Sequence, residues 1–244
     1  EGILIENMVF STNNNASFFK LANILQYRFL QATQQSQKQL ERALSLPELL
    51  YFHSKGFASK NTVSKQQFRA FWHWYGKCLT VIRFQRHIVP LFCQGFVQGF
   101  MSREHIERIL MQTPPGTFMV RFSESQPRRF AIAYCVLAPQ KQVRHYLLSP
   151  NDIKGTGRSL ADFLGEQSTF THIVQLRKDH LGKAQIKKVV PKNHALANYY
   201  SKETAQQQQP NGYDTVIKPS IPQQQQQQFY PQQQQQQFNF SNVE

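Results

Sequence analysis

The segment TFMVRFSES, residues 117–125, carries one arginine inside an apolar run that ends in two serines around a glutamate. A guanidinium inside a strand loses its hydration, and this loss costs free energy unless an anion meets it. Alternation along the strand places Arg121 and Ser123 on one face. The other face is formed by Phe118, Val120 and Phe122. The sequence therefore predicts that a core holds Arg121 and that the arginine meets an anion.

The residues around this strand indicate which anion it is. The serines that follow Arg121 supply hydroxyl donors, and a curled loop would add a run of backbone N–H groups. Upstream, Arg103 lies at the start of a short helix and is expected to reach the same end of the sheet. Two guanidinium groups match the oxygens of a tetrahedral dianion, which predicts a phosphate site. The alternative is a local ion pair between Arg121 and Glu124.

Residues 17–90 have the periodicity of packed helices. Ser64 and Gln67 have capping-box spacing and begin the longest helix, which Pro90 is expected to end. Residues 1–16 hold the apolar, strand-like ILIENMVF and a polar loop. The buried face of the longest helix is predicted to carry Phe68, Phe71, Trp72, Tyr75, Leu79 and Ile82.

From residue 94 the pattern changes from helices to strands. Ser102 is a candidate cap for a short helix, and Ser159 and Asp162 frame the start of another. Helix, antiparallel strands and helix within about a hundred residues predict an α+β fold, a sheet with flanking helices. The expected strands are 117–123, 128–138 and 142–149.

Composition limits the partners and the chemistry. The chain has 28 Lys plus Arg against 14 Asp plus Glu, a net charge of +14, which favours phosphate, nucleic acid or a membrane surface as partner. Its three cysteines are far apart, and its eight histidines show no metal-ligand spacing. No stretch approaches the ~20 apolar residues of a membrane span. We therefore expect no metal, no cofactor, no membrane partner and no enzymatic activity.

Four segments resemble known families. GTFMVRFSES, with the elements around it, resembles the signature strand and loop of a Src homology 2 (SH2) domain over residues 94–200. The segment from WHWYGKCLTV to SRE, residues 72–104, resembles the linker helix of the STAT family, the signal transducers and activators of transcription. The segments PKNHALANYYS and NGYDTVIKP resemble the closing segment and the tail tyrosine segment of the same family. The resemblance implies a chain cut from a longer protein and divided into the end of a DNA-binding domain (1–16), a helical linker domain (17–93), an SH2 domain (94–200) and a disordered glutamine-rich tail (201–244).

The resemblance also implies roles for particular residues. Arg121 would be the main phosphotyrosine-binding arginine, and Arg103 stands where many members have a lysine. Glu124 is expected to contribute its backbone N–H to the phosphate loop. His145, in VRHYLL, resembles the strand histidine beside the phosphotyrosine ring in Src-type domains, although such a histidine is more often a packing residue. The phosphate loop would consist of Ser123, Glu124 and Ser125.

The implied mechanism needs a phosphotyrosine, which the tail supplies at Tyr213, with Tyr230 as the weaker candidate. A tyrosine kinase would modify Tyr213, and each tail would enter the pocket of a second copy to form a reciprocal homodimer. The dimer would bind DNA through a domain mostly absent here and regulate transcription, moving between cytoplasm and nucleus. The alternative is an adaptor-type SH2 module that reads phosphotyrosines on other signalling proteins.

Overall fold

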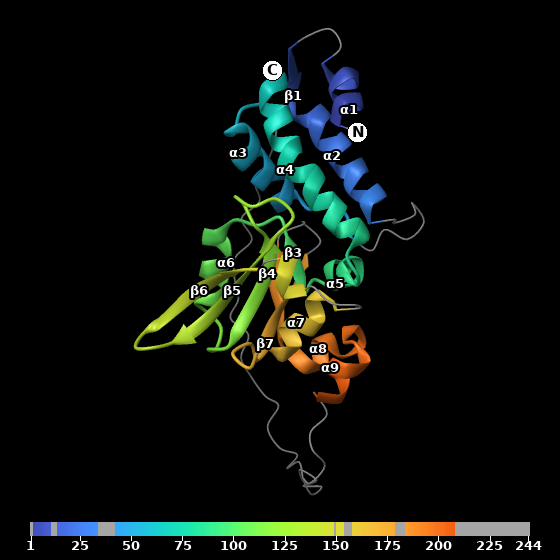
Figure 1. Cartoon of the computed structure of the whole chain (residues 1–244). Helices are drawn as coiled ribbons and strands as arrows, with labels where there is room; N and C mark the ends of the chain where they lie inside the picture. The colour runs from blue at the N-terminus through green and yellow to red at the C-terminus, as the bar shows by residue number, and fades with distance from the viewer. Residues whose placement is uncertain are drawn as a thin grey trace, which may run out of the picture. The chain divides into compact units, whose positions relative to one another are not determined.

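The computed structural model describes residues 2–10, 14–33, 42–148, 150–153, 158–178 and 184–207, and Figure 1 shows its elements. The first part holds α1 Gly2–Val9, β1 Asn15–Ser17, α2 Phe18–Ala32, α3 Leu46–Phe57, β2 Thr62–Ser64, α4 Lys65–Phe84 and α5 Ile88–Cys93. The second part holds β3 Val97–Gly99, α6 Arg103–Leu110, β4 Thr117–Phe122, β5 Phe130–Leu137, β6 Lys141–Leu147, η1 Pro150–Ile153, α7 Leu160–Glu166, β7 His172–Lys178, β8 Ala184–Pro191, α8 Lys192–Leu196, η2 Ala197–Tyr199 and α9 Lys202–Gln207. The predicted α+β class is confirmed.

The first part consists of two helix–loop–helix pairs, α1–α2 and α3–α4, whose loops meet in a short antiparallel ladder between β1 and β2. The strand predicted at ILIENMVF is wrong, because these residues form α1. Ile5 and Val9, four residues apart, lie on one face of that helix and are buried in the core. A short apolar segment fits a strand or a buried helix equally well from its pattern alone.

Capping boxes begin both long helices of the α3–α4 pair. Ser64 and Gln67 form the predicted box at the start of α4, and Ser45 and Glu48 form another at the start of α3. The predicted stop at Pro90 is wrong, because α4 already ends at Phe84 and Pro90 lies in the first turn of α5. Proline is tolerated there because the first turn needs no intrahelical N–H bond at that position.

The aromatic face of α4 was predicted with one error. Five of the six expected side chains are buried, but Trp72 is only partly buried and Trp74 takes its place in the core. Trp74 lies three residues after Phe71 and four before Cys78, both of which are buried, so it belongs to the same helical stripe. Its indole N–H donates to the backbone oxygen of Ser123 at 2.8 Å, across to the second part of the chain.

In the described residues, the second part is built on one sheet with the order β6–β5–β4–β7–β8, and β3 also pairs with β4. The β4–β5, β5–β6 and β7–β8 pairs are antiparallel, whereas β3 and β7 run parallel to β4. The three predicted strands are present as β4, β5 and β6. Strands β7 and β8 were not predicted, because basic residues interrupt their apolar pattern.

Both faces of β4 are covered, so all six of its residues are buried. Phe118 and Val120 belong to a large core that also contains residues of α4, α7 and α8. Met119 belongs to a smaller core with Ile106 and Leu110 of α6. The predicted alternation is therefore confirmed, and α6 and α7 pack on opposite faces of the strand.

The chain after the sheet folds further than expected. Residues 202–207, assigned to the disordered tail by the sequence, form α9, which packs against α7. Figure 1 shows α7, α8 and α9 together at one side of the sheet. The rest of the tail, with Tyr213 and Tyr230, lies outside the described residues.

Candidate functional site

Arg121 lies near the end of β4 with only 5% of its surface exposed. Its Nη1 donates to the backbone oxygen of Phe122 at 3.0 Å and lies 3.3 Å from a carboxylate oxygen of Glu124. Its Nε is buried and has no hydrogen-bond partner among the described residues. The guanidinium therefore retains donor capacity that its present neighbours do not use.

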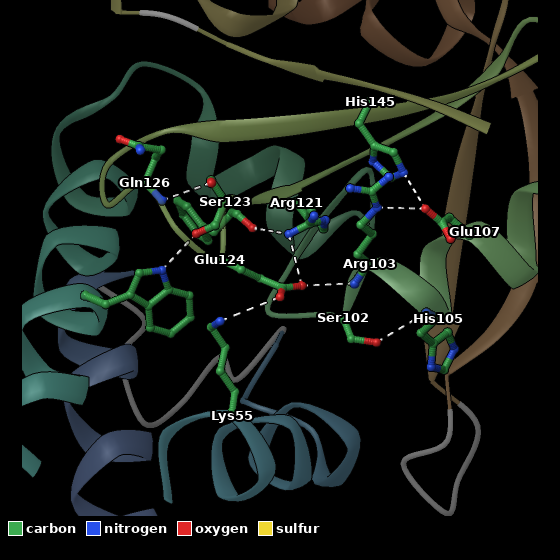
Figure 2. Close-up of polar contacts among 12 residues, drawn as sticks. Lys55, Ser102, Arg103, His105, Glu107, Arg121, Ser123, Glu124, Gln126 and His145 are labelled. Carbon is green, nitrogen blue, oxygen red and sulfur yellow. Dashed lines mark hydrogen bonds and ion pairs between the residues drawn. The ribbon is translucent and has the colours of Figure 1, made fainter. Parts of the chain in front are cut away.

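The Glu124 carboxylate is the anion that Arg121 meets (Figure 2). Its Oε1 also accepts the backbone N–H of Arg103, the first residue of α6, at 3.0 Å. Its Oε2 lies 3.6 Å from Nζ of Lys55, at the end of α3. The ion pair between Arg121 and Glu124 is thus present, and it is the carboxylate of Glu124 that contacts the cations.

A second polar cluster lies beside the first. Arg103 donates from Nε to Glu107 at 2.8 Å, one helical turn along α6, and His145 of β6 contacts the same carboxylate oxygen at 2.7 Å. Burial lowers the pKa of His145, while the hydrogen bond from Arg103 lowers the pKa of Glu107. An ionised carboxylate oxygen can only accept, so Nε2 of His145 donates to Glu107. Arg103 reaches Glu124 through its backbone and Glu107 through its guanidinium.

The loop after β4 is fixed from both sides. Ser123 accepts the backbone N–H of Gln126 on its hydroxyl at 3.1 Å and the indole N–H of Trp74 on its backbone oxygen. Its own backbone N–H donates to the backbone oxygen of Arg129 at 2.8 Å. Ser125 is exposed, and no side-chain hydrogen bond is recorded for it in the part of the chain that the structure describes. The loop places Ser123 beside Arg121, while Ser125 remains at its outer edge.

The structure brings together most of the site residues expected from the sequence and adds others. Arg121, Arg103, Ser123, Glu124 and His145 lie in two adjoining clusters (Figure 2). Sequence reasoning missed three contributors, because each depends on packing between distant segments or on the direction of a side chain. These are Lys55, Trp74 and Glu107.

The described residues contain neither a metal-binding group nor a membrane-spanning helix. No group of three or more His, Cys, Asp or Glu residues there could hold a metal ion. None of the described helices is both long and apolar enough to span a bilayer.

Two known families match separate parts of the chain. The EF-hand fold domain matches residues 1–85, and the SH2 domain matches residues 96–180. The EF-hand match agrees with the two helix–loop–helix pairs and the ladder between their loops. Calcium-binding EF-hand loops need several carboxylate ligands, and residues 10–17 and 58–65 contain no Asp or Glu.

Three relatives share the chain's sequence over most or much of its length. Signal transducer and activator of transcription A of Dictyostelium discoideum is 35% identical over 84% of this chain and 29% of that protein. Signal transducer and activator of transcription B of the same organism is 35% identical over 89% of this chain and 21% of that protein. Signal transducer and activator of transcription 4 of Mus musculus is 26% identical over 57% of this chain and 18% of that protein.

The chain spans less than a third of the length of each of these relatives. The shared region includes a matched SH2 domain, and the arginine on β4 lies within that match. The chain therefore belongs to the STAT family, the signal transducers and activators of transcription, as a segment that contains the SH2 domain.

Proposed function

We propose that this segment is the phosphotyrosine-binding part of a STAT-type signalling transcription factor, and that the cluster around Arg121 binds the phosphate. The observation that carries the proposal is the convergence of a buried guanidinium, a helix N-terminal N–H and an ammonium on one carboxylate, that of Glu124. A carboxylate resembles two oxygens of a phosphate in shape and charge. The donors are therefore already arranged for an oxyanion.

The phosphate would replace Glu124 on the cations. The side chain of Glu124 is 30% exposed, so its carboxylate lies at the edge of the cluster and can turn toward solvent. A phosphate carries close to two charges at pH 7 and offers one more acceptor oxygen than a carboxylate. That extra oxygen can accept the unused Nε–H of Arg121. We expect binding without hydrolysis, since the residues around Glu124 provide no cysteine nucleophile.

Tyr213, which lies outside the described residues, would supply the phosphotyrosine. Alpha helix α9 packs on α7, on the face of the sheet opposite to α6. Arg121 faces the α6 side, so α9, the last described element, lies on the side of the sheet away from Arg121. Five residues separate Gln207 from Tyr213, and the six residue steps between them span at most ~21 Å. This favours exchange of tails between two copies, related by a two-fold axis, over binding within one chain.

The experiment is to phosphorylate Tyr213 and measure the mass of the chain in solution. We expect the phosphorylated chain to double its mass at micromolar concentration, because two weak contacts act together. Tyr213→Phe should prevent the change and Tyr230→Phe should not.

A phosphorylated chain that stays monomeric at these concentrations would contradict the reciprocal dimer. If such a chain still bound phosphotyrosine peptides from other proteins through Arg121, an adaptor-type SH2 module would replace the reciprocal dimer as the proposed function.

The remaining parts of the proposed function lie outside this segment. Dimerisation would bring two DNA-binding domains, contributed by other parts of the protein, onto a symmetric site. A tyrosine kinase would start the process, and the dimer would pass from cytoplasm to nucleus and regulate transcription. The segment itself would act by binding, and not as an enzyme.

A further inference from the structure

Lys55 comes from outside the region matched by the SH2 domain, residues 96–180, yet it reaches the Glu124 carboxylate. It lies in the last turn of α3, and Figure 2 shows its side chain directed from that helix toward Glu124. The side chain is 29% exposed, which leaves the ammonium accessible to a ligand. The cluster at the end of β4 therefore includes one cation contributed by the helical part of the chain.

The position of Lys55 is fixed by the packing of α3. Phe52 and Phe57, on either side of it in the sequence, are both fully buried. The capping box at Ser45 fixes the other end of the helix. The Glu124 carboxylate that Lys55 contacts also contacts Arg121 and the backbone N–H of Arg103, which belong to two other elements. Its ammonium is thus held near the point where the other donors converge.

We infer that Lys55 is a direct ligand of a phosphate bound at this cluster, so that the helical region and the SH2 domain share one binding site. The inference rests on the proposed function, because it names a further residue of the same site. In the absence of ligand, the two oxygens of Glu124 stand in for two oxygens of the phosphate. When the phosphate takes their place, Lys55 pairs with one of its oxygens, while Arg121 and the Arg103 N–H bind the others.

The alternative is that Lys55 serves only as a surface ion pair that ties α3 to the loop after β4. Such a pair contributes little and would affect ligand binding only through Glu124. The two roles differ when Glu124 has lost its charge. If Lys55 binds the phosphate, replacing it still weakens binding when Glu124 is uncharged. If Lys55 acts only as the ion-pair partner of Glu124, replacing it then has no further effect on binding.

The test is a double-mutant cycle with Lys55→Gln and Glu124→Gln in the whole chain, left unphosphorylated. The probes are a peptide of residues 207–220 with phosphorylated Tyr213 and, separately, free phosphotyrosine, titrated by calorimetry. Lys60→Gln, the same charge change just after α3, is the matched control, because no ion pair is recorded for Lys60 among the described residues. Thermal unfolding of each variant checks the fold.

We expect Lys55→Gln to weaken binding by about fivefold to tenfold, both alone and in the Glu124→Gln background. Lys60→Gln should leave affinity within about twofold. The inference is overturned if the loss of affinity disappears in the Glu124→Gln background, or if there is no loss in either background. In both cases the proposed function is kept as long as binding still depends on Arg121. If neither probe binds the unchanged chain, or if binding is indifferent to Arg121, the proposed function fails and this inference fails with it.

Discussion

Replacing Arg121 by lysine is expected to weaken phosphotyrosine binding by at least about 100-fold. A lysine keeps the charge but loses the planar fork and the Nε–H that the phosphate would use. Two charge-assisted hydrogen bonds of about 1.5 kcal/mol each amount to about 3 kcal/mol, or roughly 100-fold in affinity. Titration of the whole chain with the Tyr213 phosphopeptide measures the loss.

The control for this prediction is Arg108→Lys, the same chemical change at an exposed position of α6. Its affinity should match that of the unchanged chain. Because Arg121 is buried, the thermal midpoint of Arg121→Lys must also be measured, to show that a loss of binding is not a loss of folding. A folded Arg121→Lys chain with unchanged affinity would remove Arg121 from the site.

Replacing Phe52 by alanine is expected to destabilise the chain by about 3–5 kcal/mol, the usual cost of a deleted core phenylalanine. Phe52 is fully buried. Its ring centroid lies 5.1 Å from that of Tyr75 on α4 and 4.8 Å from that of Phe100, beyond β3. Urea unfolding followed by tryptophan fluorescence measures the change. Phe19→Ala, at a side chain that is 73% exposed, is the matched control and should change stability by less than about 0.5 kcal/mol.

The same substitution tests whether the two parts of the chain unfold together. From Phe100 the ring contacts continue to Phe122 at 5.3 Å and then to Phe130 at 4.9 Å, so aromatic packing runs from α3 into the sheet. The domain boundary between residues 93 and 94 stays a prediction, and one core crosses it. We expect a single cooperative transition by circular dichroism and fluorescence, shifted as a whole by Phe52→Ala. Two separate transitions, with only the first shifted, would contradict this.

Much of the fold could be predicted because it is encoded locally. The capping box at Ser64, the alternation around Arg121 and the cap at Ser102 each depend on a few neighbouring residues, and the structure shows all three. Local patterns failed where they were ambiguous. The apolar run of α1 fits a helix or a strand, and the basic residues of β8 mask its pairing with β7.

The candidate site was only partly predictable, because its geometry depends on contacts between distant segments. Trp74 donates a hydrogen bond to Ser123, 49 residues later in the sequence, and Lys55 on α3 contacts Glu124 in the loop after β4. No spacing rule connects such positions. Net charge and loop composition suggested an anion, but they could not show that Glu124 turns its own carboxylate toward Arg121. That orientation is decided by the whole set of donors that surround it.

The most direct test is a crystal structure of the chain with the phosphorylated Tyr213 peptide. The account predicts that phosphate oxygens lie within ~3 Å of the Arg121 guanidinium and the Arg103 backbone N–H, with the Glu124 carboxylate moved away from both. A phosphotyrosine bound elsewhere, with Glu124 still paired to Arg121, would contradict it.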